Sequence, residues 1–253
     1  GTLVEVGDIE FQGLKFSYPD EDTLSLKGID IKISQGQTLG VVGVIGSGKT
    51  TLAQMLLRFY DPTAGALLIG DRPIKEIHRL RDSIGYVSQE PFLFSMSIRD
   101  NIVLGRVSAT DCELEEIVRI AGLKKDVERF PHRLDTLIGE RGVSLSGGQK
   151  QRVALARALI KKPEILILDD AFSHLDSETE EEILENIQGQ LRQTTTLIIS
   201  HRLSAVRGAD QIIVMDAGQI IEQGNHASLV RAGGVYANLF QNQLLAREME
   251  ILL

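Results

Sequence analysis

A glycine-rich loop between an apolar run and a helical stretch sets the strongest limits on the fold of this chain. The run Leu39–Gly43 is short and apolar, which predicts a buried strand, and a helix is expected from about Lys49 to Tyr60. Residues 43–50 fit the pattern G-x-x-x-x-G-K-[ST]. Glycines let such a loop wrap with its N–H groups pointing inward, and the following helix presents its positive end to an anion. The sequence therefore predicts a strand–loop–helix unit that holds a phosphate.

The loop and one later strand supply the groups that a Mg²⁺–nucleotide needs. Lys49 is expected to reach the β- and γ-phosphates, and the Thr50 hydroxyl to ligate Mg²⁺. The apolar strand Ile165–Leu168 leads into Asp169, and open α/β sheets bind ligands at that end of their strands. Asp169 would hold the same ion directly or through water. The loop residues expected to bind the phosphates are Gly43, Gly46, Ser47, Gly48, Lys49, Thr50 and Thr51.

A second anion site is expected about a hundred residues further along the chain. The segment Leu145-Ser-Gly-Gly-Gln149 comes directly before a strong helical pattern. Ser146 and the N–H groups of Gly147 and Gly148 can therefore meet an anion at the positive end of that helix. The two phosphate-binding devices need not face the same phosphate within one molecule.

The order of the patterns predicts an α/β domain. Strands and helices alternate in the last third of the chain, which indicates a mainly parallel sheet with helices on both faces. Residues 89–160 lose strand signals and gain helical ones, which predicts a helical insertion into a strand-rich core. We expect a single domain over 1–253, with its core at about 1–88 and 161–235, a helical subdomain at about 89–160 and a terminal helix at about 235–253.

Composition excludes several other classes of protein. The chain has 35 Asp and Glu residues against 27 Lys and Arg, a formal net charge of -8, which argues against broad nucleic-acid binding. Cys112 is the only cysteine, so an intramolecular disulfide is impossible and a reducing compartment is expected. No stretch approaches the roughly 18 apolar residues of a membrane span, and no secretory signal opens the chain.

Together these motifs resemble the ATP-binding-cassette (ABC) ATPases over nearly the whole chain. Leu145–Gln149 resembles the signature motif of that family, which acts in trans on the γ-phosphate held by the P-loop of a partner cassette. The resemblance implies a P-loop NTPase (RecA-like) core with a largely parallel sheet and an N-terminal antiparallel β subdomain. It also implies ATP and Mg²⁺ as cofactors and a second nucleotide-binding domain as partner. The signature residues implied to close over ATP are Ser146, Gly147, Gly148 and Gln149.

Further residues match the family in order along the chain. Tyr18 resembles the aromatic residue that stacks on adenine, and Asp176 resembles the end of the loop that contacts the dimer partner. Gln89 resembles the glutamine that links the core to the helical subdomain, and His201 the histidine that contacts the γ-phosphate. The implied catalytic residues are Asp170, His201 and Gln89, and the implied metal site comprises Thr50, Gln89 and Asp169.

Two segments are similar to the exporter branch of the family. The residues from Gln89 to Ile102 resemble the stretch that follows the glutamine in exporters, and Gly139–Gly142 resembles a segment that touches the coupling helices of the membrane domain. The chain begins with Gly1 rather than Met. We therefore expect the cytosolic domain of a larger membrane transporter, at the cytoplasmic face and without a nucleic-acid partner.

The chain departs from the family at Asp170, where most members have the glutamate that orients or activates the attacking water. Aspartate is one methylene shorter, about 1.5 Å. A misplacement of about 1 Å can cost a catalytic group about a hundredfold. The departure predicts a site that binds ATP but hydrolyses it slowly, as in one half of a heterodimeric exporter, where the intact signature would serve the partner's P-loop.

Two other interpretations stay open at the level of sequence. One is a homodimeric exporter in which Asp170 is a competent base. The other is a binding module that closes on ATP and scarcely hydrolyses it. A second departure, His174, stands where the family has a small residue, and it either alters communication across the dimer or is tolerated by its surroundings.

Overall fold

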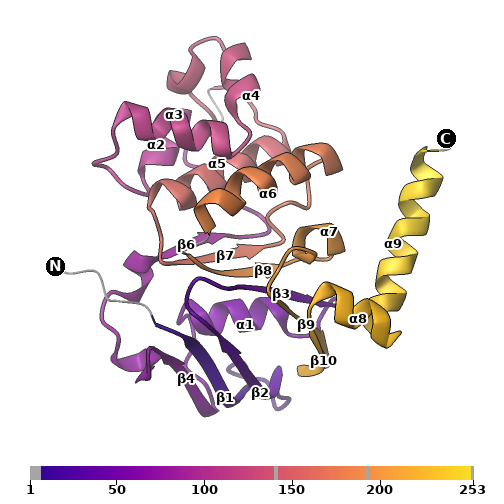
Figure 1. The fold of residues 1–253 in the computed structure, drawn as a ribbon. Coiled ribbons are helices and arrows are strands. Elements are labelled where there is room, and N and C mark those ends of the chain that lie inside the picture. The colour runs from indigo at the N-terminus through magenta and orange to yellow at the C-terminus, as the bar shows by residue number, and fades with distance from the viewer. Residues whose placement is uncertain (1–6, 140–141, 192–193, 252–253) are drawn as a thin grey trace. The chain divides into compact units, whose positions relative to one another are not determined.

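The computed structural model describes residues 7–139, 142–191 and 194–251 (Figure 1). These residues form two compact units. The first unit takes residues up to Leu80 together with those from Thr195 onward, and the second comprises Arg81–Thr194. The chain thus leaves the first unit, builds the second and returns to the first. Glu140 and Arg141, which belong to the segment predicted to touch a membrane domain, lie outside the described residues.

The first unit opens with an antiparallel sheet, as predicted for the N-terminal part of the chain. Alternate side chains of its second strand are buried, including Ile29, Ile31 and Ile33, so one face of this strand packs into the core. Phe11 on the neighbouring strand pairs with Ile31 and is also buried. The strands, in sheet order, are β2 (Leu26–Ile33), β1 (Ile9–Phe16), β4 (Ala64–Ile69) and β5 (Arg72–Pro73).

Parallel strands form the other sheet of the first unit. The strand before the glycine-rich loop, β3 (Thr38–Gly43), lies between β8 (Thr195–Ile199) and β9 (Gln211–Asp216) and runs parallel to both. β10 (Gln219–Gly224) pairs with β9 in the antiparallel sense. The helices of this unit are α1 (Lys49–Leu56), η1 (Ile74–Glu76), α7 (Leu203–Val206), α8 (His226–Ala232) and α9 (Val235–Ile251).

The helix after the glycine-rich loop is shorter than predicted, because α1 ends at Leu56 and not near Tyr60. Arg58 adopts a left-handed conformation with φ of 51°. Its N–H donates to the Met55 carbonyl, and the Phe59 N–H donates to the Gln54 carbonyl, which together form a Schellman motif. That position usually carries glycine, so no local pattern indicated that the helix ends there.

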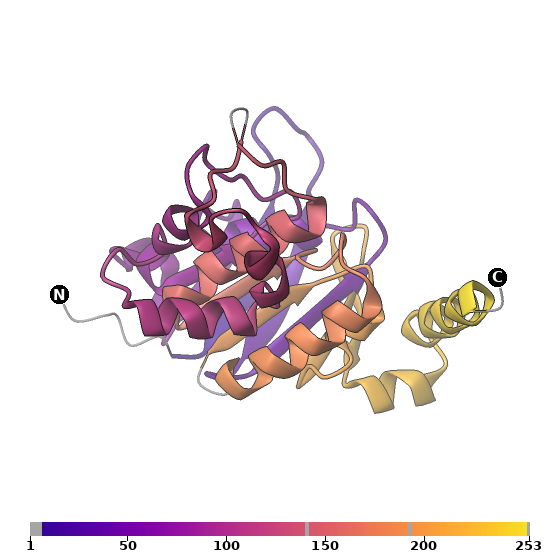
Figure 2. The same ribbon diagram turned by 90° about the horizontal axis from the view of Figure 1, so that it is seen from above.

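The second unit contains two parallel strands and most of the helices. β6 (Ile84–Val87) pairs with β7 (Ile165–Asp169). α5 contacts α2, α3 and β6 (Figure 2). Most apolar side chains of α5 are buried, including Val153 and Leu159. The helices of this unit are α2 (Ile98–Val103), α3 (Asp111–Ile120), α4 (Lys124–Arg129), η3 (Arg133–Asp135), α5 (Gly147–Ile160) and α6 (Ser177–Leu191), preceded by η2 (Leu80–Ser83).

No helix within the described ranges is both long enough and apolar enough to cross a lipid bilayer.

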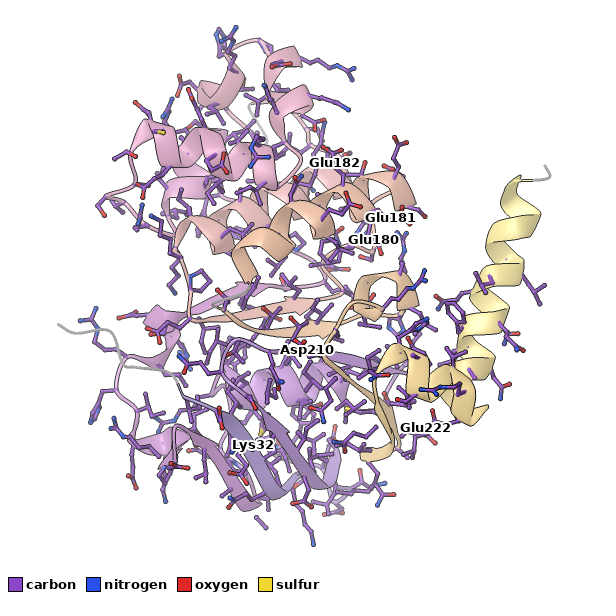
Figure 3. The ribbon with its side chains drawn as sticks, viewed as in Figure 1. Lys32, Glu180, Glu181, Glu182, Asp210 and Glu222 are labelled. Carbon is purple, nitrogen blue, oxygen red and sulfur yellow. The ribbon has the colours of Figure 1, made fainter. Side chains whose placement is uncertain are left out.

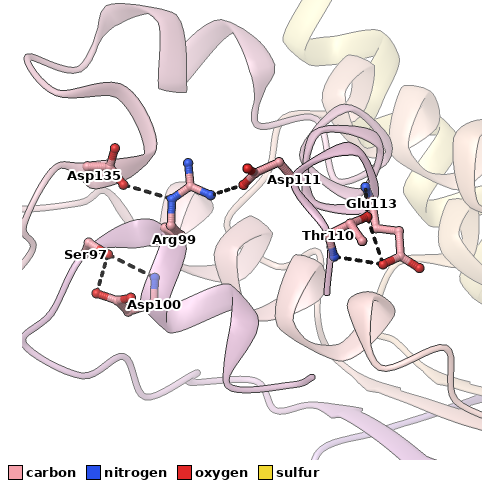
Figure 4. A network of polar contacts seen from close by, with 7 residues as sticks. All are labelled: Ser97, Arg99, Asp100, Thr110, Asp111, Glu113 and Asp135. Carbon is pink, nitrogen blue, oxygen red and sulfur yellow. Dashed lines mark hydrogen bonds and ion pairs between the residues drawn. The ribbon is translucent and has the colours of Figure 1, made fainter. Parts of the chain in front are cut away.

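A capping box begins α3 and carries two ion pairs. Thr110 and Glu113 exchange hydrogen bonds between side chain and backbone, at 2.9 Å and 3.3 Å (Figure 4). The Glu113 carboxylate also pairs with Arg106 and, at 2.6 Å, with Lys162. The Arg106 guanidinium first, and then the Lys162 ammonium and the Thr110 N–H, hold the pKa of Glu113 well below its ordinary value. The ionised carboxylate therefore stabilises the folded chain.

This arrangement predicts how stability depends on pH. A carboxyl whose pKa is lowered by folding stabilises the protein above its unfolded pKa, near 4.5, and this stabilisation is lost as the pH falls further. We expect Glu113→Gln to lower the melting temperature by a few degrees at pH 7, and by progressively less below pH 4.5. Thermal melts of both proteins across pH measure this. Glu115→Gln, an exposed neighbour on α3, is the control, and an equal loss in that variant would contradict the assignment.

Candidate nucleotide-binding site

The glycine-rich loop closes around the side chain of Lys49. Its ammonium donates hydrogen bonds to the carbonyls of Gly43 and Val44, at 2.9 Å and 2.8 Å, and lies 3.4 Å from the Ser47 hydroxyl. The Lys49 side chain is buried although it carries a charge. A buried ammonium needs oxygen partners, and here the loop supplies them from its own backbone. The loop therefore holds a positive charge at the start of α1.

The loop conformation requires glycine at its first position. Gly43 has φ of 154°, and a Cβ there would lie 2.2 Å from the Met215 carbonyl oxygen. The N-cap of α1 is Gly48, which has no side chain to cap the helix, and the first turn of α1 contains no acidic residue. The first N–H groups of a helix are satisfied by caps, water or ligands. This helix start is therefore suited to an anion.

Tyr18 contacts the helix that follows the glycine-rich loop. The Tyr18 hydroxyl contacts the Thr51 hydroxyl at 3.0 Å and donates to Gln54 at 2.8 Å, so Tyr18 is anchored on α1. Its ring packs edge-on against Tyr60, with centroids 5.3 Å apart. Thr51 is buried and its hydroxyl faces Tyr18, whereas Thr50 is exposed.

His201 lies at the same edge of the sheet as the glycine-rich loop. Val41 of β3 is opposite Ile199 of β8 in this parallel pair. Gly43 and His201 each follow that register position by two residues, and the carboxyl ends of parallel strands share one edge. His201 is exposed there. The first unit thus brings the loop and His201 together.

In the second unit, two carboxylates follow one another at the end of β7. Asp169 and Asp170 are both buried. Burial first, and then the negative charge of Asp169, raise the pKa of Tyr86 on the adjacent strand β6 to about 12. Asp170 has φ of 48°, a left-handed conformation that aspartate tolerates better than most residues. Asp170, the residue at which the chain departs from the family, therefore has a constrained backbone.

The signature segment forms the start of α5. The Ser146 hydroxyl accepts from the Gln149 N–H at 3.2 Å, and the Gln149 side chain accepts from the Ser146 N–H at 2.9 Å, a complete capping box. Gln149 also donates to Asp126 at 2.8 Å. A Cβ at Gly147 would lie 2.9 Å from the ring of His174, and one at Gly148 would lie 2.9 Å from its carbonyl oxygen. Glycine is therefore needed here for close packing.

One residue at the centre of the second unit had not been singled out from the sequence. Gln151 is 1% exposed; its amide donates to the Ser173 hydroxyl at 2.8 Å and to the Asp170 carbonyl at 3.3 Å, and accepts from the His174 N–H at 3.0 Å. It also donates to the Gln89 carbonyl at 3.4 Å. Gln151 could have been identified from the sequence as a polar residue on the apolar face of a helix. Gln151 joins the segments that carry Gln89 and Asp170.

Asp176 and Gln89 stand at loop positions of the second unit. The Asp176 carboxylate accepts from the Thr179 N–H at 2.9 Å and from the Thr179 hydroxyl at 2.8 Å, at the start of α6. These bonds, the N–H first, hold the pKa of Asp176 below its ordinary value. Gln89 follows β6 and is exposed. The roles of both residues toward a nucleotide or a dimer partner stay predictions.

Comparison with known proteins agrees with these motifs. Residues 26–173, more than half of the chain, match the family model described as ABC transporter. The chain is 45% identical over 96% of its length to the "Probable multidrug resistance ABC transporter ATP-binding/permease protein YheI" of Bacillus subtilis. It is 44% identical over 94% of its length to the "ATP-dependent lipid A-core flippase" of Chromobacterium violaceum. It covers 42% and 41% of these two proteins.

A solved structure gives the same answer for the fold. "Structure of a bacterial Atm1-family ABC exporter with ATP bound" superposes with a TM-score of 0.91 at 39% identity, covering 96% of this chain and 43% of that one. The predicted α/β fold, with its parallel strands and N-terminal antiparallel sheet, is thereby confirmed. The chain belongs to the ABC transporter family and is an ATPase domain of the kind found in its exporters.

Proposed function

We propose that this chain is the nucleotide-binding domain of an ABC exporter, in which ATP-driven pairing of two such domains powers transport across a membrane. The observation that carries the proposal is the presence of two complementary anion devices in one chain. The first unit has the loop around Lys49, and the second has the helix start capped by Ser146. A head-to-tail pair of cassettes would bring one device of each chain onto each ATP.

The residues of the site fit ATP and Mg²⁺. Mg²⁺ takes a few protein oxygens and completes its shell with water and phosphate. Thr50 and Asp169 would each supply such an oxygen, and among the described residues no three His, Cys, Asp or Glu side chains gather into a metal cluster of their own. When bound, the ion neutralises phosphate charge. Lys49 would hold the β- and γ-phosphates, and Tyr18 would stack on the adenine.

Hydrolysis needs a group that orients water toward the γ-phosphorus. Asp170 directly follows β7, and it would accept a hydrogen bond from that water. Gln89 would contact the same region, and His201 would donate to a γ-phosphate oxygen as charge develops there. Because the Asp170 side chain is short and its backbone is held in a left-handed conformation, we infer that its carboxylate is poorly positioned to act as the catalytic base.

The proposed function also implies two partners. They are a second nucleotide-binding domain, of a different chain if the weak site belongs to a heterodimer, and the transmembrane domain of the transporter. The domain would then lie at the cytoplasmic face of the membrane. Because similar proteins include a probable multidrug resistance transporter and a lipid A-core flippase, drugs and lipids are the cargo classes that we propose.

The test is steady-state ATP hydrolysis by the parent chain and by Asp170→Glu. If Asp170 is too short to act well, the longer carboxylate raises kcat about tenfold, part of the hundredfold that a 1 Å misplacement can cost. Asp170→Asn then leaves the slow parent rate almost unchanged. Asp169→Glu, the same extension at the metal-binding position, should instead lower the rate.

The competing interpretations give different results. A competent Asp170 would show a brisk parent rate, no gain with Asp170→Glu and a loss of more than about tenfold with Asp170→Asn. A binding module would close on ATP in all variants and hydrolyse it in none. The melting temperature of each variant distinguishes two causes of a lower rate. Loss of the catalytic base alone leaves the melting temperature unchanged, whereas distortion of the left-handed turn lowers it.

A further inference from the structure

The terminal helix α9 is held at its first turn by a strand of the first unit. The carboxylate of Glu222 on β10 accepts from the N–H groups of Val235 and Tyr236, the latter at 3.0 Å (Figure 3). A carboxylate at this end of a helix is also favoured by the helix dipole. Tyr236 is fully buried, and its hydroxyl contacts His226 Nδ1 at 2.9 Å. α9 therefore leaves the sheet in a defined direction.

Two turns further along, α9 contacts the segment that contains His201. The Gln243 side chain donates through Nε2 to the His201 carbonyl at 2.7 Å, and its Oε1 accepts from the Leu203 N–H at 2.9 Å. Gln243 lies eight residues after Val235, about 12 Å along the helix axis. One carboxamide thus holds two consecutive peptide groups, on either side of Arg202.

The second of these bonds meets a need of the backbone. Leu203 is the first residue of α7, and the first N–H groups of a helix lack partners within it. The N-cap of α7 is Arg202, which makes no side-chain cap. Gln243 supplies that cap from another helix. Without it, the peptide groups that follow His201 would have fewer restraints on their orientation.

We propose that Gln243 is a positioning residue for His201 in ATP hydrolysis. The proposal rests on the function proposed above, in which the His201 imidazole meets the γ-phosphate. The direction of a side chain follows from its backbone, and Gln243 restrains the backbone at His201. α9 would thereby act on the reaction without touching the nucleotide, through a contact that links the end of the domain to its site.

The experiment measures single-turnover hydrolysis and Mg²⁺–ATP binding by the chain. Gln243→Leu, which is close in volume but has no polar group, should slow hydrolysis about fivefold to tenfold, because small misplacements of a catalytic group are costly. The Kd for Mg²⁺–ATP should stay within about twofold. Gln243→Glu keeps the acceptor for Leu203 but loses the donor to His201. Its hydrolysis rate should therefore lie between the rate of the parent chain and that of Gln243→Leu. Gln241→Leu, an exposed glutamine of the same helix, is the control.

Variants of His201 separate this inference from the proposed function. His201→Ala should slow hydrolysis about a hundredfold, as loss of a transition-state donor does. In that background Gln243→Leu should have no further effect, because its target is gone. If His201→Ala is slow but Gln243→Leu hydrolyses at the parent rate, or if the two losses multiply, the positioning role is wrong. If the parent chain does not hydrolyse ATP at all, or His201→Ala leaves the rate unchanged, the proposed function fails instead.

Discussion

Lys49→Met is expected to lower ATP hydrolysis by the chain about a thousandfold, the upper range for removal of a charged group from a developing phosphate charge. Methionine keeps most of the buried stem but loses the ammonium that the loop carbonyls of Gly43 and Val44 hold. ATP affinity should fall as well, because the same charge contacts the bound phosphates. Hydrolysis and nucleotide binding, measured on the same preparation, report both effects.

A second lysine of the same unit provides the control. Lys32 lies on β2, pairs with Asp8 at 2.9 Å and is half exposed (Figure 3). Lys32→Met removes the same charge, and it should leave kcat and KM within about twofold, as expected for an exposed pair. A Lys49→Met protein that hydrolyses ATP at the parent rate would show that the loop is not the nucleotide site.

Ser146→Ala is expected to lower hydrolysis about a hundredfold, the lower range for removal of one donor from a developing charge. The Ser146 oxygen accepts the Gln149 N–H through a lone pair, which leaves its own O–H group to donate to a phosphate. In the proposed pair of cassettes that phosphate belongs to the ATP on the partner's P-loop. Alanine removes both the donor and the cap.

The loss of the cap needs its own control, because it costs about 0.5–2 kcal/mol by itself. Thr110→Ala removes a matched capping box from α3, and it should lower the melting temperature comparably with little effect on kcat. Ser146→Asp keeps a good cap but places a negative charge before the phosphate, so it should be stable and inactive. Full turnover in Ser146→Ala would contradict the assignment of Leu145–Gln149 as the trans-acting signature.

The fold could be predicted from the sequence where the hydrophobic periodicity and the positions of the glycines indicated the same elements. The strands at 39–43 and 165–168 and the helix after Ser146 were predicted, because apolar runs and helical periodicity are local properties, whereas the N-terminal antiparallel sheet was implied by the resemblance to the family. The family was predicted from motif order and is confirmed. The roles of the individual site residues stay predictions, since they concern a nucleotide and a second cassette.

Other features depended on contacts that no local pattern encodes. The early end of α1 relies on a left-handed Arg58, where a glycine would have been the usual sign. Gln151 and Gln243 make hydrogen bonds to segments that are distant in sequence, and a glutamine in a helix gives no sign of its partner. Their identification required the tertiary structure.

The close approach of His174 to the signature glycines has a consequence for how related sequences can diverge. Neither Gly147 nor Gly148 can gain even a methyl group while the His174 segment stays in place. A larger residue at either position is therefore expected to destabilise the folded chain by steric clash, whether or not a nucleotide is bound. A cassette that abandons its signature would first have to reshape the neighbouring loop, so the two segments are expected to drift as a pair and not one at a time.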